Sequence, residues 1–411
     1  MLDVATIVRE VILLLLVALT VILITRRLTV PYTLGLVIVG LLIGVLDLVP
    51  EVRLTPDLIL FVFLPGLLFE GSWSLSVARL RINRLPIFLL AVPGLLLALV
   101  LIALPLHFFV GLSWLDAFLL ASILSPTDPV AVLGLFRQLK INENLSTIIE
   151  GESLFNDGVA GALYQTFLAL VLITANGGHL TLGAAWWQGL ETLLLEAGGG
   201  VLVGFVCGFL VSRFVKHIDE PLIETTITIV TAYGVYLLAD FAHMSGILAV
   251  IVAGLIFGSY GQSQGMSERT REVVDNFWNM AAFLVNALLF LLVGAQLNLS
   301  LFLSAPNVPR LAFTAVLSIV AVLVARFIIV VGILPRKPSS QPGVHLRAWR
   351  FVIFWSGLRG ALSLALVLAL PLAVPDRDAL IFATYAVVLF TLLVQGFSLR
   401  LLLKRLPSVL R

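Results

Sequence analysis

The chain has 411 residues, of which 60% are hydrophobic and 12% are charged, and its formal net charge is +2. Because about a quarter of the residues in a soluble globular domain are charged, this composition excludes an ordinary soluble protein and indicates a polytopic membrane protein. The mean hydropathy of +1.13 agrees with that class. No basic run with interleaved aromatic residues indicates a nucleic-acid partner, so we expect membrane lipid and small cations as partners instead.

Apolar runs of the length that crosses a bilayer follow one another along the whole chain. The expected fold class is all-α, with about thirteen transmembrane helices. They are predicted near residues 6–25, 31–48, 56–71, 85–110, 114–137, 145–174, 186–215, 221–241, 245–260, 270–298, 309–335, 348–371 and 378–403.

The positions of the basic residues predict how the chain is oriented in the membrane. Most of the 25 Lys and Arg residues fall in loops that follow odd-numbered helices, and cytoplasmic loops carry such an excess. We therefore expect a multi-pass protein of the cell membrane with its N-terminus outside and its C-terminus in the cytoplasm. The first apolar run lacks a basic leader and a cleavage site and precedes Arg26 and Arg27, so we interpret it as a retained helix.

Two predicted helices carry helix-breaking sequence at mid-depth, and their positions correspond. The whole chain is expected to form one transmembrane domain in which residues 1–174 form a first six-helix repeat, 186–215 a connecting helix and 221–405 a second, inverted repeat. The fifth helix then contains Ser125-Pro-Thr-Asp-Pro129, and its counterpart, the twelfth, contains Ser356-Gly-Leu-Arg-Gly360. Proline and glycine both interrupt helices. Paired interruptions of this kind predict crossed discontinuous helices and a transporter binding site, whereas a simple proline kink is the alternative.

Charged residues at these interruptions are expected to neutralise the dipoles of half-helices. Asp128 suits the positive N-termini, and Arg359 suits the negative C-termini. We also expect Glu152 to form a buried structural ion pair with Arg359. Arg326 has no obvious partner in the sequence and is interpreted as structural.

A candidate cation site lies on the sixth helix. Ser153 and Asp157 are four residues apart and share one face, while Glu152 and Asn156 share the next. Hard cations bind carboxylate, hydroxyl and carbonyl oxygens. We therefore predict sodium ligation by Asp157, Ser153, Glu70 of the third helix and the carbonyl of Thr127. For Glu70, an interfacial position is the alternative.

A buried acidic site of this kind suggests an exchange reaction. Protons and a monovalent cation would compete for the same oxygens, because the site crosses the membrane readily only when one of them neutralises it. No cofactor is expected, since the ligands are the transported H⁺ and Na⁺ or Li⁺. One-for-one exchange moves no net charge, so that each pH unit supplies about 1.36 kcal/mol of driving force.

Five segments, in this order along the chain, resemble signatures of the monovalent cation:proton antiporters, in particular the NhaP-type and eukaryotic sodium/proton exchangers. They are Phe63-Leu-Pro-Gly-Leu-Leu-Phe-Glu70, Ser125-Pro-Thr-Asp-Pro-Val-Ala-Val132, Gly151-Glu-Ser-Leu-Phe-Asn-Asp-Gly158, His243-Met-Ser-Gly-Ile-Leu-Ala249 and Gly357-Leu-Arg-Gly-Ala-Leu-Ser363. The resemblance implies an NhaA-like antiporter fold, an elevator-like movement, a homodimer and no enzymatic activity. It also implies electroneutral exchange, with Asn156 orienting ligands instead of titrating.

The same residues are compatible with other functions to different degrees. A potassium/proton exchanger or a cation channel on this scaffold is the main alternative. An intramembrane aspartyl protease that uses Asp128 and Asp157 is weak, because its Gly-x-Gly-Asp signature is absent and Pro129 follows Asp128 directly. A receptor is disfavoured because no soluble signalling module is attached. A row of small residues at Gly200, Gly204 and Gly208 can serve dimerisation or packing within one subunit.

Overall fold

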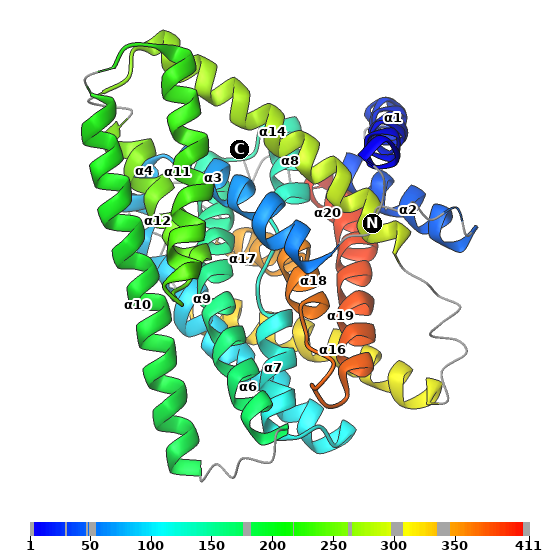
Figure 1. The fold of residues 1–411 in the computed structure, drawn as a ribbon. Helices are drawn as coiled ribbons and strands as arrows, with labels where there is room; N and C mark the ends of the chain where they lie inside the picture. The colour runs from blue at the N-terminus through cyan, green and yellow to red at the C-terminus, as the bar shows by residue number, and fades with distance from the viewer. Residues whose placement is uncertain are drawn as a thin grey trace.

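The computed structural model consists entirely of helices and connecting turns in the part of the chain that it describes (Figure 1). Described are residues 4–28, 31–46, 48, 55–175, 182–216, 218–261, 265–296, 307–334 and 346–405.

Eight helical segments within these ranges are long and apolar enough to cross a membrane. They contain, in chain order, α1 (Val4–Leu28), α5 (Arg84–Leu89) continuing into α6 (Leu95–Pro105), α9 (Glu143–Ala175), α10 (Leu182–Val215), α11 (Pro221–Phe241), α14 (Glu268–Ala295), α16 (Val308–Gly332), and α19 (Arg377–Phe390) continuing into α20 (Gly396–Arg405). The continuous segments pass through π-helical turns, η2 (Leu90–Gly94) and η3 (Leu106–Val110) around α6 and η5 (Thr391–Gln395) before α20.

The remaining helices are shorter. They are α2 (Tyr32–Val45), α3 (Leu64–Ser74) preceded by the π-helical turn η1 (Leu58–Phe63), α4 (Val77–Ile82), α7 (Trp114–Leu124), α8 (Val130–Leu139), α12 (Gly246–Ile256) with η4 (Phe257–Gly261), α17 (Leu346–Trp355) and α18 (Ala361–Leu368). All of them except α4 overlap a predicted span, whereas α4 lies in the predicted loop between residues 71 and 85.

Both predicted interruptions are present as non-helical segments. The chain leaves α7 at Leu124 and resumes a helix at Val130, and it leaves α17 at Trp355 and resumes at Ala361. Prolines account for the first break because Pro126 and Pro129 lack amide donors. In the second break, glycines at 357 and 360 flank Arg359, and they lower the tendency to continue the helix.

The helices pack in two groups. One contains α2, α3, α10, α11, α12 and α14; the other contains α6, α7, α16, α18 and α19. In Figure 1 the first group includes the long green pair α10 and α11, and the second includes the orange α18 and the red-orange α19. The long helix α9 contacts both α7 of one group and α10 and α12 of the other. Residues on α9 therefore lie between the two groups.

The small-residue row on α10 packs inside the subunit. A side chain at Gly200, Gly204 or Gly208 would run into Ser245, Ala249 and Ala253 of the α12 segment. The glycines thus allow α10 and α12 to approach closely, as small residues do between membrane helices. Because this row is occupied within the chain, it is not a dimer contact.

Candidate functional site

The two helix breaks touch each other directly. The backbone amide of Asp128 donates to the carbonyl of Leu358 over 2.8 Å. Unwound backbone at membrane depth needs such partners, because no water of the hydrocarbon region can satisfy it. The four half-helices α7, α8, α17 and α18 therefore meet at one crossing.

Asp128 lies at the N-termini of two of these half-helices. Its Oδ1 accepts from the amide of Val130, the first residue of α8, over 2.9 Å, and its Oδ2 accepts from the amide of Ala361, the first residue of α18, over 3.5 Å. A side chain at Gly360 would collide with this carboxylate. The acid is thus placed where a carboxylate neutralises N-terminal helix dipoles.

Arg359 lies at the opposite kind of helix end. Its Nε donates to the carbonyl of Leu124, the last residue of α7, over 2.6 Å, and a terminal guanidinium nitrogen donates to Gly357 O over 3.0 Å. The side chain is 2% exposed. A buried cation at these carbonyls offsets the negative end of α7, which is the position that the sequence indicated.

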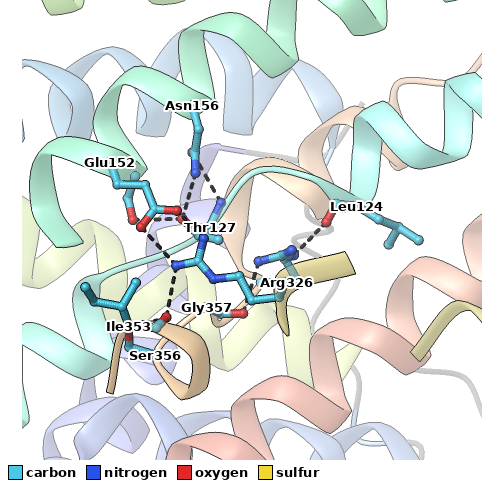
Figure 2. A network of polar contacts seen from close by, with 10 residues as sticks. Leu124, Thr127, Glu152, Asn156, Arg326, Ile353, Ser356 and Gly357 are labelled. Atoms are coloured by element: carbon cyan, nitrogen blue, oxygen red, sulfur yellow. Dashed lines mark hydrogen bonds and ion pairs between the residues drawn. The ribbon is translucent and has the colours of Figure 1, made fainter. Parts of the chain in front are cut away.

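Glu152 is paired with Arg326 and not with Arg359, which corrects the pairing expected from the sequence (Figure 2). One guanidinium nitrogen of Arg326 donates to Glu152 Oε2 over 2.9 Å, the other contacts Oε1, and the first also donates to Ile353 O over 3.0 Å. Glu152 is 1% and Arg326 7% exposed. The bidentate geometry explains how this buried pair is tolerated, and it gives Arg326 the partner that was missing.

Thr127 connects the first break to α9 (Figure 2). Its hydroxyl lies 2.9 Å from the Ser153 hydroxyl and accepts from the Asn156 amide nitrogen over 2.8 Å, while the Thr127 backbone amide donates to Asn156 Oδ1 over 3.3 Å. Asn156 therefore uses both ends of its amide to hold the unwound chain, consistent with an orienting function.

Asp157 borders a small cavity of about 80 Å³ beside this network. The lining comprises Leu64, Leu67, Pro126, Thr127, Asp128, Pro129, Val130, Asp157, Asn286, Gly360, Ala361, Leu362 and Ser363. Asp157 is half-buried, and none of the ion pairs formed by the described residues involves it. Its charged neighbours are Asp128 and Arg359. An unpaired carboxylate at mid-chain of a spanning helix can bind a cation or a proton.

Ser153 and Glu70 lie next to this cavity but do not line it. Ser153 is one turn before Asp157 and is connected to the cavity through Thr127. Glu70 is half-buried on α3, three residues beyond the cavity-lining Leu67, and its charged neighbours are Glu150 and Arg137. It therefore extends the cavity-facing side of α3 by one turn, about 5 Å.

Three polar residues near the site were missed in the sequence. Glu150 lies two turns before Asp157 on the same face of α9, a spacing that was visible. Asn286 is a single polar residue in the apolar second half of α14, and Ser363 belongs to a motif that was noted for its arginine. Only the three-dimensional structure brings Asn286 and Ser363 to the Asp157 cavity.

Comparison with known proteins decides the family. Residues 12–405 match the family model described as sodium/hydrogen exchanger, transmembrane. The chain belongs to this family. It is a transporter family, so the protease alternative is excluded.

Its relatives include several bacterial antiporters. The chain is 40% identical over 384 residues to the low-affinity Na⁺/H⁺ antiporter NhaS1 of Synechocystis, covering 92% of this chain and 70% of that protein. It is 37% identical over 354 residues to the Na⁺/H⁺ antiporter NhaP of Pseudomonas aeruginosa, covering 84% and 80%. The structure of the sodium proton antiporter MjNhaP1 from Methanocaldococcus jannaschii superposes with a TM-score of 0.74 at 19% identity, over 97% of this chain and 98% of that one. This last likeness establishes the fold.

Proposed function

We propose that this exchanger-family member is an Na⁺/H⁺ antiporter in which both ions compete for Asp157. The observation that carries the proposal is the unpaired Asp157 carboxylate in a cavity at the crossing of two broken helices. Relatives described as Na⁺/H⁺ antiporters support the choice of ions. Lithium is expected to substitute for sodium because it is also a small, hard monovalent cation.

The cation is held by Asp157 and by the Thr127 carbonyl, which the helix break releases from helical hydrogen bonding. Ser153 supports this carbonyl through the Thr127 hydroxyl. Glu70 lies one turn away. Its negative charge attracts the cation toward the cavity as the ion enters. Carboxylate and carbonyl oxygens are the donors that hard cations prefer.

The exchange is electroneutral in this proposal, with one cation for one proton. The argument is that the other polar groups at the cavity are already engaged. Asp128 uses both oxygens on helix N-termini, and Asn156 carries no charge and holds Thr127. A single exchangeable carboxylate binds one proton or one monovalent cation, so each half-cycle carries the same charge.

The same proposal includes an architecture of thirteen spans with the repeats and connecting helix at 1–174, 186–215 and 221–405. Eight long helices, three shorter apolar ones and the two broken pairs α7–α8 and α17–α18 support this count. We further propose that the protein is a homodimer of the cell membrane with its N-terminus outside and its C-terminus inside. Labelling single cysteines near either terminus with an impermeant reagent, in a variant without Cys207, tests the orientation.

Purified protein in proteoliposomes provides the decisive experiment. Imposed Na⁺ or Li⁺ gradients should drive internal pH changes, with equal rates whether or not the membrane potential is clamped. Asp157→Asn protein should give the signal of empty liposomes. A pH change driven by K⁺ alone would favour the potassium/proton alternative. A cation current without coupled pH change would favour a channel and contradict the proposal.

A further inference from the structure

Ser363 has a buried hydroxyl at the cavity that no described residue uses as a hydrogen-bond partner. It is the third residue of α18, 1% exposed, and its Oγ has no hydrogen-bond partner among the described residues. Buried polar side chains are nearly always hydrogen-bonded, so an exception calls for an explanation. Ser363 borders the same small cavity as Asp157, so both side chains are available to an ion bound there.

The other hydroxyl on the cavity lining is already engaged. Thr127 Oγ1 accepts from Asn156 and is within hydrogen-bond distance of Ser153 Oγ. Ser153 itself does not line the cavity. Of the two lining hydroxyls, Ser363 therefore has unused oxygen lone pairs.

The charges around Ser363 favour a neutral oxygen as an additional cation ligand at this position. Asp157 supplies one negative charge, Asp128 offsets the N-terminus of α18, and Arg359 acts on Asp157 from the α7 side. A further carboxylate would change the charge balance of the exchange. A hydroxyl adds a hard oxygen ligand and leaves that balance unchanged.

We propose that the Ser363 hydroxyl is a ligand of the transported cation, together with the Thr127 carbonyl and Asp157 of the same cavity, and that it sets how strongly Na⁺ competes with the proton. This inference rests on the proposed antiport at Asp157. The hydroxyl replaces one water of the incoming ion's hydration shell. When a proton occupies Asp157 the cavity holds no cation, and the oxygen contributes little. The residue thus favours the cation-loaded form selectively.

The test compares Ser363→Ala and Ser363→Cys with Ser318→Ala in proteoliposomes. Ser363→Cys keeps the side-chain size but replaces the hard oxygen with soft sulfur. Ser318 on α16 is a matched control, because it is 0% exposed, its hydroxyl also lacks a partner among the described residues, and it does not line the cavity.

Both Ser363 variants should raise the Km for Na⁺ about tenfold, which converts to about 1.4 kcal/mol, with a maximal rate near that of the parent. Because cation and proton compete, the pH of half-maximal exchange at fixed Na⁺ should rise by about one unit. The Km ratio for Li⁺ and Na⁺ should also change. Ser318→Ala should match the parent in all three measurements.

Parental Km values, pH profiles and Li⁺/Na⁺ ratios in both folded Ser363 variants would overturn the inference. So would equal changes in Ser318→Ala, since these would reflect a general effect of removing a buried hydroxyl. Failure of the parent protein to exchange Na⁺ for H⁺ would instead contradict the proposed function. Exchange by the parent, none by Asp157→Asn and normal Ser363 variants would contradict only the role of Ser363.

Discussion

Two carboxylates five residues apart on α9 have opposite surroundings: one has an ion-pair partner and the other borders a cavity. Glu152 faces α16 and is held by both terminal nitrogens of Arg326, whereas Asp157 faces the cavity and forms no ion pair within the described ranges. At about 100° per residue, the two side chains point about 140° apart around the helix. The buried charge of Glu152 has a permanent partner, whereas Asp157, the proposed exchange site, has no ion-pair partner among the described residues.

The largest expected effect comes from neutralising the exchangeable carboxylate. Asp157→Asn should abolish Na⁺-driven proton flux, because the amide neither titrates nor supplies a charged ligand. The variant should keep the thermal stability of the parent in detergent, since no ion pair is lost. Flux and melting temperature are the two measurements. Exchange above the level of empty liposomes would show that the site lies elsewhere.

Breaking the permanent pair should instead reduce stability. Glu152→Gln leaves Arg326 buried without its counter-charge, and removal of one partner from a buried pair destabilises proteins by about 3 to 5 kcal/mol. The matched control is Glu143→Gln, which breaks the exposed pair with Arg79, and should change stability by about 1 kcal/mol or less. Thermal unfolding of both variants in the same detergent makes the comparison. Equal melting temperatures would contradict a structural role for the Glu152–Arg326 pair.

Glu70 is a third carboxylate to set beside Asp157 and Glu152, because it is acidic but lies one turn away from the cavity. Glu70→Gln removes a long-range attraction of about 1 kcal/mol, so the Km for Na⁺ should rise roughly fivefold. The increase should shrink at high ionic strength if Glu70 acts over a distance. A complete loss of exchange at saturating Na⁺ would indicate that Glu70 binds the cation directly.

The smallest effect is expected at Ser153. Ser153→Ala removes one neutral hydrogen bond to Thr127, a net contribution of about 0.5 kcal/mol at the low end of the usual range, so Km should rise about twofold. Initial rates over a range of Na⁺ concentrations measure this. A rise as large as that of the Ser363 variants would make Ser153 a direct ligand.

The sequence was a good guide to features that depend on local pattern. The spans follow from runs of apolar residues, and both helix breaks follow from Pro126, Pro129 and the glycines beside Arg359. The positions of Asp128 and Arg359 at helix ends could be reasoned from charge alone, because a broken helix exposes dipoles of known sign.

Long-range pairing was beyond the sequence. Glu152 and Arg326 are 174 residues apart, and two arginines were available at membrane depth. Glu152 pairs with Arg326 because Arg359 donates its hydrogen bonds to the carbonyls of Leu124 and Gly357. The geometry of the helix crossing determines those bonds, and the sequence alone does not show it. Ser363 was hidden for a related reason, since a serine in an apolar helix gives no sign of which cavity it borders.

The hydrogen bond between the Asp128 amide and the Leu358 carbonyl ties the two unwound strands of the crossing together. If one unwound segment moves during transport, we expect this bond to carry the other with it, so that the oxygens proposed to bind the cation keep their spacing. We infer a carrier with a single intrinsic affinity, whose net direction is dictated by the gradients alone. Equal Na⁺ half-saturation from either face, at matched acidity, is its signature, and a large asymmetry would refute it.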